Sequence, residues 1–176
     1  MTFRWVLRRV TIETYGDVFD RLERDHVRYV VVSGVAVVLH GYVRPIADLD
    51  LVICPTPDET RRAMRALNAL GFVPSIPLPL SLLTVLRMFD QSQREVDVFV
   101  RYRIPFEELW ASSERMCVGN GVAPRVASLE HLLRVKRING RAHDLLDIEG
   151  LLALEAGGRG RINSAPVADG SQDESA

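Results

Sequence analysis

Residues 29–53, YVVVSGVAVVLHGYVRPIADLDLVI, decide the fold of this chain. The run Tyr29–Val32 is apolar and β-branched, which predicts a buried strand, and Ser33-Gly34 follows it where the chain must turn. A short helix is expected over the next six residues, and Gly41 is a natural stop for it. Gly34 would then bring bare backbone amides close to a bound anion, for which phosphate is the obvious candidate.

The second half of the stretch carries two aspartates separated by one residue. Residues 47–53, ADLDLVI, alternate with the period of a β-strand, so Asp48 and Asp50 share one face and apolar side chains share the other. Carboxylates about 7 Å apart on one strand face repel each other unless a cation lies between them. Hard divalent cations prefer oxygen ligands, and the pair therefore predicts a site for Mg²⁺ or Mn²⁺.

The order of these features resembles the nucleotidyltransferase superfamily that shares its fold with DNA polymerase β. The shared features are a strand, a Ser-Gly turn, a short helix followed by His-Gly, an arginine and the Asp-x-Asp strand. Within the superfamily the chain is similar to a small bacterial branch, which contains aminoglycoside-type and abortive-infection (type IV toxin) nucleotidyltransferases. It departs from that branch in two places. Ser33-Gly34 reverses the polarity of the usual pair, and Ile46 stands where threonine is common.

The resemblance implies an α/β (α+β) fold class. We expect the minimal nucleotidyltransferase fold, a mixed central sheet flanked by helices with a short C-terminal helical appendage. It also implies a third carboxylate on a strand beside the Asp-x-Asp strand, and Asp97 on a strand predicted over residues 95–101 matches it. Taken alone, Asp97 would more often belong to a solvated edge strand. The implied catalytic and metal-binding set is Asp48, Asp50 and Asp97, with Mg²⁺ (or Mn²⁺) as cofactor.

The implied activity is transfer of a nucleoside monophosphate from a nucleoside triphosphate, such as ATP, to a hydroxyl acceptor. That acceptor would be an antibiotic-like small molecule, a tRNA end or a protein, and a toxin role would add a cognate antitoxin as partner. Ser33 and Gly34 would cradle the β and γ phosphates, and Arg44 would contact phosphate or pair with Asp48 or Asp50. Two alternatives stay open: a catalytically inactive nucleotide-binding or partner-binding module, and a generic α/β domain whose carboxylates are surface residues.

The single lysine of the chain lies within an apolar helical stripe. Ser128 and Gly140 bound a predicted helix, and Lys136 falls at the spacing of Leu129, Leu132 and Leu133. A charge there is costly unless it reaches an anion or water. The alternatives are a lysine that interacts with the helix dipole or, as the resemblance implies, a cation for the triphosphate. The second alternative predicts that Lys136→Met leaves stability equal or higher.

The residues after Lys136 complete the same C-terminal motif, Leu-x-x-x-Lys followed by Gly-Arg-x-x-Asp-x-x-Asp. We expect Asp144 and Asp147 to hold Arg141 and Lys136 in place rather than to take part in catalysis. A last helix over 142–154 would turn its leucines and isoleucine inward; these are Leu145, Ile148, Leu151 and Leu152.

Length and composition predict one domain with a sizeable core, since 47% of the 176 residues are hydrophobic. Its parts would be an unassigned lead (1–16), the catalytic core (17–127), C-terminal helices (128–156) and a disordered tail (157–176) rich in Gly, Ser, Asp and Ala.

The net charge of -1 indicates no broad nucleic-acid footprint. Cys54 and Cys117 lie too far apart to indicate zinc or a disulfide framework, and both are expected to be small buried hydrophobic residues. With no transmembrane or signal segment, a cytoplasmic protein with no membrane partner is expected.

Overall fold

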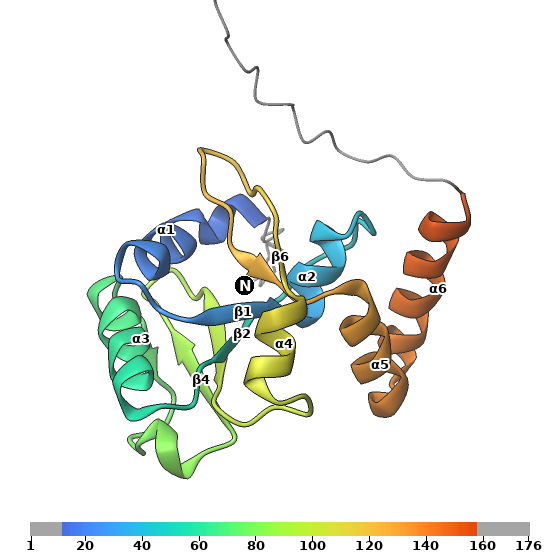
Figure 1. Ribbon diagram of the computed structural model, residues 1–176. Helices are drawn as coiled ribbons and strands as arrows, with labels where there is room; N and C mark the ends of the chain where they lie inside the picture. Colours follow the sequence, from blue (N-terminus) through green and yellow to red (C-terminus); the bar gives the residue numbers. More distant parts are fainter. Residues whose placement is uncertain (1–11, 158–176) are drawn as a thin grey trace, which may run out of the picture.

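The computed structural model describes residues 12–157, which fold around one mixed sheet (Figure 1). Its seven strands lie in the order β3-β4-β5-β2-β1-β7-β6. The strands are β1 (Tyr29–Val32), β2 (Leu49–Ile53), β3 (Val73–Pro74), β4 (Val85–Phe89), β5 (Glu95–Phe99), β6 (Glu114–Arg115) and β7 (Arg125–Val126). The mixed α/β class expected from the sequence is confirmed.

Helices pack against the sheet on both sides. They are α1 (Gly16–Arg24), α2 (Ser33–Leu39), α3 (Pro57–Ala69), α4 (Phe106–Ser112), α5 (Leu129–Asn139) and α6 (Ala142–Ala156), with 3₁₀ turns η1 (Ile12–Tyr15) and η2 (Leu80–Leu82). Figure 1 shows α1 and α3 side by side at one end of the sheet, with α5 and α6 standing together at the other. The expected helical appendage is therefore the α5–α6 pair.

The two strands of the opening stretch form the centre of the sheet. β1 and β2 pair antiparallel, with Tyr29 opposite Ile53, and every residue of both strands is buried. β5 then pairs with β2 in parallel and with β4 antiparallel. Burial on both faces explains why the valine-rich run Tyr29–Val32 is continuous rather than alternating.

The ends of α5 follow the predicted capping signals, and α3 begins with a cap of the same kind. The Thr56 hydroxyl accepts a hydrogen bond from the Glu59 backbone amide at the start of α3, and Ser128 does the same for His131 in α5. Gly140 ends α5 with φ of 63°, in the left-handed region that glycine adopts without strain.

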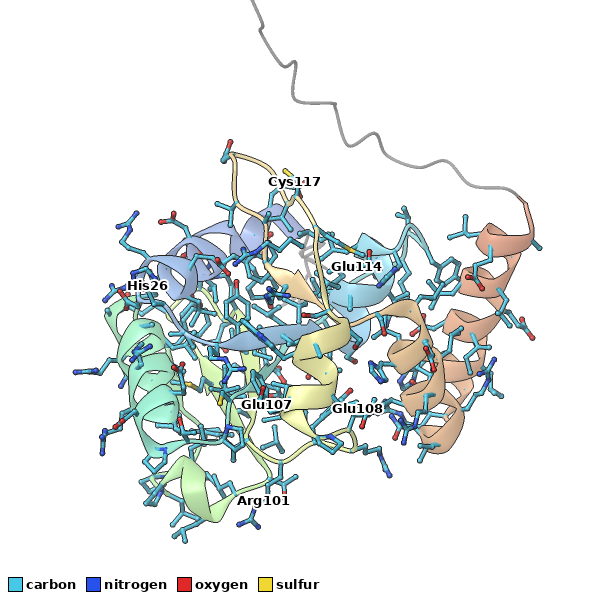
Figure 2. All side chains as sticks on the ribbon, viewed as in Figure 1. His26, Arg101, Glu107, Glu108, Glu114 and Cys117 are labelled. Carbon is cyan, nitrogen blue, oxygen red and sulfur yellow. The ribbon has the colours of Figure 1, made fainter. Side chains whose placement is uncertain are left out.

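Four local expectations were wrong. Helix α2 starts at Ser33 instead of Val35, and a strand that the sequence predicts over residues 82–89 starts only at Val85, as β4, because Leu82 belongs to η2. Leu145 and Leu152 of α6 are 52% and 39% exposed rather than inward. Cys117, expected to be buried like Cys54, lies exposed in the loop between β6 and β7 (Figure 2).

The helical pair is attached through a small apolar cluster of its own. Val37 of α2, Leu133 of α5 and Leu151 of α6 form its buried part. Gly150 lets α6 approach closely, because a Cβ on it would lie 2.3 Å from the Tyr42 ring. A glycine inside a helix costs about 1 kcal/mol relative to alanine, and here it makes room for the tyrosine.

The predicted tail from 158 onward and most of the predicted lead, residues 1–11, lie outside the described residues. Residues 12–15 of that lead form η1. Within the part of the chain that the structure describes, none of the helices has the length and apolarity needed to span a bilayer.

Candidate active site

Three charged side chains stand in a row across neighbouring strands. Asp50 of β2 pairs in register with Asp97 of β5, and Asp97 pairs in register with Arg87 of β4. Residues opposite one another in a sheet point to the same face, so the row is fixed by strand pairing. The sequence-based expectation that Asp97 lies on a strand beside the Asp-x-Asp strand is confirmed.

A tight carboxylate cluster forms at this place. Asp48, Glu95 and Asp97 each contribute an oxygen, and the three oxygens lie within 4.8 Å of one another. Asp50 stands next to the cluster on the same strand face as Asp48. Glu95 was missed from the sequence, although its signal is visible: Glu95-Val96-Asp97 repeats the acidic alternation of Asp48-Leu49-Asp50 on the adjoining strand.

The charges in this cluster are only partly compensated by the protein. Burial, followed by the repulsion of Asp48, raises the pKa of Asp50 to about 7, against which a Ser33 hydrogen bond acts. Burial and the nearby Asp97 also raise the pKa of Asp48, and burial raises that of Glu95. Raised carboxylate pKa values are expected where negative charges gather with too few cations.

Arg87 is the cation in direct contact with the cluster. Its Nε and Nη2 donate to the two oxygens of Asp97 at 3.0 and 2.9 Å, and Nε lies 2.7 Å from Glu95 Oε1. These contacts raise the pKa of the guanidinium, so Arg87 stays charged. No role for Arg87 was predicted from the sequence, because the register that sets it opposite Asp97 was unknown.

The cluster opens into a cavity of about 780 Å³ between the sheet and the helical pair. Asp48, Asp50 and Asp97 line it from the sheet. Ser33, Gly34 and Arg44 line it from the α2 side, and Asn139, Arg141 and His143 line it from the C-terminal helices. Six of the seven predicted site residues therefore share one cavity; the seventh, Lys136, does not line it.

Ser33 and Gly34 stand where β1 meets α2, directly beside Asp50. Ser33 has φ of 57°, a left-handed conformation that is uncommon for residues other than glycine and costs about 1 kcal/mol or more. Gly34 faces Arg44, and a Cβ there would lie 3.1 Å from the guanidinium. The glycine thus admits Arg44 to the cavity wall, which is a role the sequence did not suggest.

Arg44 pairs with the C-terminal helix rather than with Asp48 or Asp50. Its Nε lies 2.7 Å from Asp147 Oδ1, and its Nη2 donates to Asp147 Oδ2 at 3.0 Å. Because Arg44 also lines the cavity, a phosphate contact by it stays a prediction.

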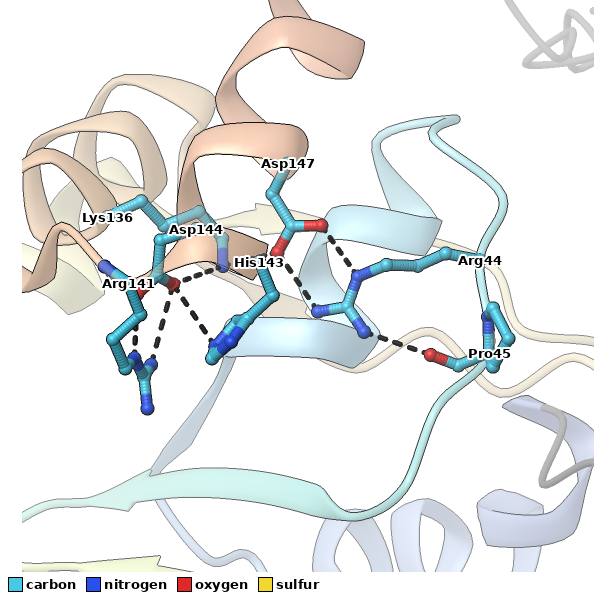
Figure 3. A network of polar contacts seen from close by, with 7 residues as sticks. All are labelled: Arg44, Pro45, Lys136, Arg141, His143, Asp144 and Asp147. Carbon is cyan, nitrogen blue, oxygen red and sulfur yellow. Dashed lines mark hydrogen bonds and ion pairs between the residues drawn. The ribbon is translucent and has the colours of Figure 1, made fainter.

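Lys136 belongs to the same buried ionic network, shown in Figure 3. Its Nζ lies 2.6 Å from Asp147 and 3.2 Å from Asp144, and the side chain is almost fully buried. Arg141 completes the chain of contacts by donating from Nε to Asp144 at 2.7 Å. The expectation that the two aspartates hold Lys136 and Arg141 agrees with this arrangement. A triphosphate contact by Lys136 stays a prediction.

Two other arginines were missed from the sequence. Arg101 and Arg103 follow β5 and line the same cavity as Asp97 of that strand. Both are exposed, and Figure 2 shows Arg101 extending away from the body of the protein. Among residues 12–157 neither has a hydrogen bond or ion pair with another side chain. Unpaired cations at the mouth of an acidic cavity are suited to an anion that carries a metal into it.

The donor set fits a hard divalent cation. Its groups are all carboxylates, their oxygens converge from two neighbouring chain segments, and burial raises the pKa values of Asp48 and Glu95, whose negative charge a cation would neutralise. Asp48, Glu95 and Asp97 are the residues that would hold it, with Asp50 adjacent.

No protein-family model and no curated protein matches this sequence, but solved structures match its fold. The lincosamide antibiotic adenylyltransferase LnuA, solved with lincomycin bound, has a TM-score of 0.61 at 15% identity; the match covers 84% of this chain and 99% of LnuA. ANT(2")-Ia in complex with adenylyl-2"-tobramycin has a TM-score of 0.61 at 11% identity, over 84% and 89% of the two chains.

An antigenic nucleotidyltransferase-like protein from Paracoccidioides brasiliensis also matches. Its TM-score is 0.55 at 18% identity, with 81% of this chain and 76% of the other covered. Together with the strand order, these matches define the chain as a protein of nucleotidyltransferase fold. The candidate carboxylate cluster lies within that fold.

Proposed function

We propose that the protein is a metal-dependent nucleotidyltransferase that moves a nucleoside monophosphate from a nucleoside triphosphate to a hydroxyl acceptor. The observation that carries the proposal is the convergence of Asp48, Glu95 and Asp97, the first and last of which line the cavity, in a nucleotidyltransferase fold. ATP is the favoured donor, because the LnuA and ANT(2")-Ia structures both concern adenylyl transfer. The antitoxin partner rests on the resemblance in sequence alone.

The transfer forms one bond from the acceptor oxygen to the α-phosphorus and breaks the bond from that phosphorus to pyrophosphate. Bound divalent cations supply activation of the attacking oxygen and stabilisation of the leaving oxygen. The protein's own part is to place the donor and accept the acceptor's proton, for which Asp97 is the proposed group. Arg87 holds both oxygens of Asp97, so this role requires Arg87 to release at least one.

The rest of the cavity would hold the triphosphate. Ser33 and Gly34 would cradle the β and γ phosphates, and Arg44 lies close enough to Gly34 to join them. Arg101, Arg103 and Arg141 add positive charge at the mouth. Because Lys136 is already bonded to two buried aspartates, its effect on the triphosphate would be indirect, through Arg44 and Arg141.

The acceptor is proposed as a small hydroxyl compound, which the lincomycin and tobramycin complexes of the structural neighbours support. A tRNA end or a protein hydroxyl are the other acceptors that the resemblance allows. A cavity of about 780 Å³ is large enough for a nucleotide and part of a small acceptor.

Calorimetry of Mn²⁺ binding, with and without a non-hydrolysable ATP analogue, tests the proposal. Mn²⁺ should bind more tightly with the analogue present, and the double variant Asp48→Asn/Asp50→Asn should lose that binding while staying folded. Asp58→Asn, an exposed aspartate on α3, serves as the matched control and should bind like the parent. Unchanged Mn²⁺ affinity in the double variant would falsify the assignment of the site.

A catalytically inactive nucleotide-binding module is the second candidate. It is favoured by Arg87, which partly neutralises the cluster without any metal. Such a module would bind the ATP analogue with equal affinity in EDTA and in Mn²⁺, and would release no pyrophosphate with any acceptor.

A further inference from the structure

Arg87 occupies the oxygens that a metal ion would need. Both oxygens of Asp97 and one oxygen of Glu95 accept from its guanidinium or lie within ion-pair distance of it. Two of the three carboxylates that form the cluster are thus already bonded to a cation of the protein itself. A divalent ion close to the same oxygens would also be repelled by the guanidinium charge.

The charge count explains what Arg87 does in the protein without metal. Asp48, Glu95 and Asp97 are three carboxylates within a few ångströms of one another, and Arg87 forms ion pairs with two of them, Glu95 and Asp97. Without Arg87, only the pairing of the strands would hold these carboxylates together against their mutual repulsion. The arginine therefore relieves repulsion in the metal-free fold at the same place where metal would relieve it.

Arg87 also has the freedom to leave. Its side chain is 50% exposed and lines the open cavity. Arg94, on the same β-hairpin, provides the contrast: it is 16% exposed and bonded to Asp90, Asp17 and the Thr14 carbonyl. Arg94 is fixed in the structure, whereas Arg87 can exchange its carboxylate partners for solvent.

We propose that Arg87 is a built-in competitor of the divalent cation, which holds Glu95 and Asp97 in the metal-free protein and must release them when the cation binds. The inference rests on the proposed function in one respect, that a divalent cation is the cofactor. It follows that the site binds metal alone weakly. A nucleotide that brings both a cation for the carboxylates and phosphates for the freed guanidinium would shift the equilibrium.

The test is Arg87→Met, which keeps most of the apolar stem and removes the charge. Titration with Mn²⁺ alone should give a dissociation constant at least about tenfold lower than in the parent, as removing a charge within about 5 Å of the ion predicts. In EDTA the variant should melt at a lower temperature than the parent, and Mn²⁺ should raise its melting temperature by more. Arg94→Met, the matched control, should lose stability without a change in Mn²⁺ affinity.

Arg87→Lys keeps the positive charge but cannot bridge both oxygens of Asp97. Its Mn²⁺ affinity should therefore lie between that of the parent and that of Arg87→Met. This variant also serves if Arg87→Met fails to fold. Folded variants that bind Mn²⁺ no more tightly than the parent would overturn the inference, since Arg87 would then be arranging the ligands for the metal. Variants and parent that all fail to bind Mn²⁺ would overturn it as well.

Nucleotide transfer separates this inference from the proposed function. Tighter Mn²⁺ binding in Arg87→Met, with no transfer by the parent, would support the competition and refute the enzyme. Transfer by the parent, with unchanged Mn²⁺ affinity in Arg87→Met, would support the enzyme and refute the competition.

Discussion

Asp50 should make the metal-free protein less stable as the pH rises. Its pKa is raised from 3.8 to about 7 by burial and by Asp48, so between these values the folded state holds a proton that the unfolded state has lost. The stabilisation is therefore complete when the pH is below the pKa of Asp50 in the unfolded protein. It decreases as the pH rises, until the pH passes the pKa of Asp50 in the folded protein. A shift of about 3 units corresponds to about 4 kcal/mol when complete.

The substitution Asp50→Asn removes this term while keeping the shape of the side chain and an oxygen that can accept from Ser33. The variant should gain stability over the parent, and the gain should grow by about 2 to 3 kcal/mol between about pH 5 and pH 8. Urea unfolding in EDTA at several pH values, followed by circular dichroism, measures both curves. EDTA is needed because bound metal would itself neutralise Asp50.

Asp90→Asn provides a control of opposite sign. Burial opposes ionisation of Asp90, but hydrogen bonds from Arg94 outweigh it and lower the pKa of Asp90. Asp90 contributes its full stabilisation when the pH is above its pKa in the unfolded protein. That stabilisation is lost as the pH falls towards the lower pKa of Asp90 in the folded protein. Asp90→Asn should thus cost stability at neutral pH and less in acid. If the difference in the free energy of unfolding between Asp50→Asn and the parent stays constant between about pH 5 and pH 8, the reasoning is refuted.

Two further predictions concern the attachment of the C-terminal helices. Gly150→Ala should destabilise the protein by about 1 to 2 kcal/mol in urea unfolding despite its better helix propensity, since the new Cβ would meet the Tyr42 ring at 2.3 Å; an unchanged or higher stability would mean that Tyr42 moves freely. Lys136→Met should cost about 3 to 5 kcal/mol, because Asp144 and Asp147 would each lose a buried partner. A variant as stable as the parent would contradict this second estimate.

The expected effect of Lys136→Met on stability is thus the reverse of the one drawn from the sequence. The apolar spacing correctly marked Lys136 as a buried lysine, and the motif correctly suggested aspartates as its partners. Spacing along one helix could not show that α6 folds back and closes over the amine. The stability effect depends on that tertiary contact, which local pattern does not encode.

The same division holds for the rest of the fold and site. Strand and helix positions near Ser33 and Asp48 were predictable because glycine turns, caps and period-two alternation are local signals. Glu95 and Arg87 were missed because their place depends on the register of β5 with β2 and of β4 with β5. Leu145 was placed inward on helical spacing alone, yet α6 buries only a narrow strip against α2 and α5.

The position of the only lysine has a practical consequence for following the motion of this protein. Among side chains, reagents that acylate primary amines leave the twenty-one arginines unmodified and find one lysine, which is 4% exposed. Acylation of Lys136 therefore requires Asp144 and Asp147 of α6 to release its amine. The chain carries its own chemical reporter of that opening, because the rate of modification of Lys136 measures how often α5 and α6 separate around it.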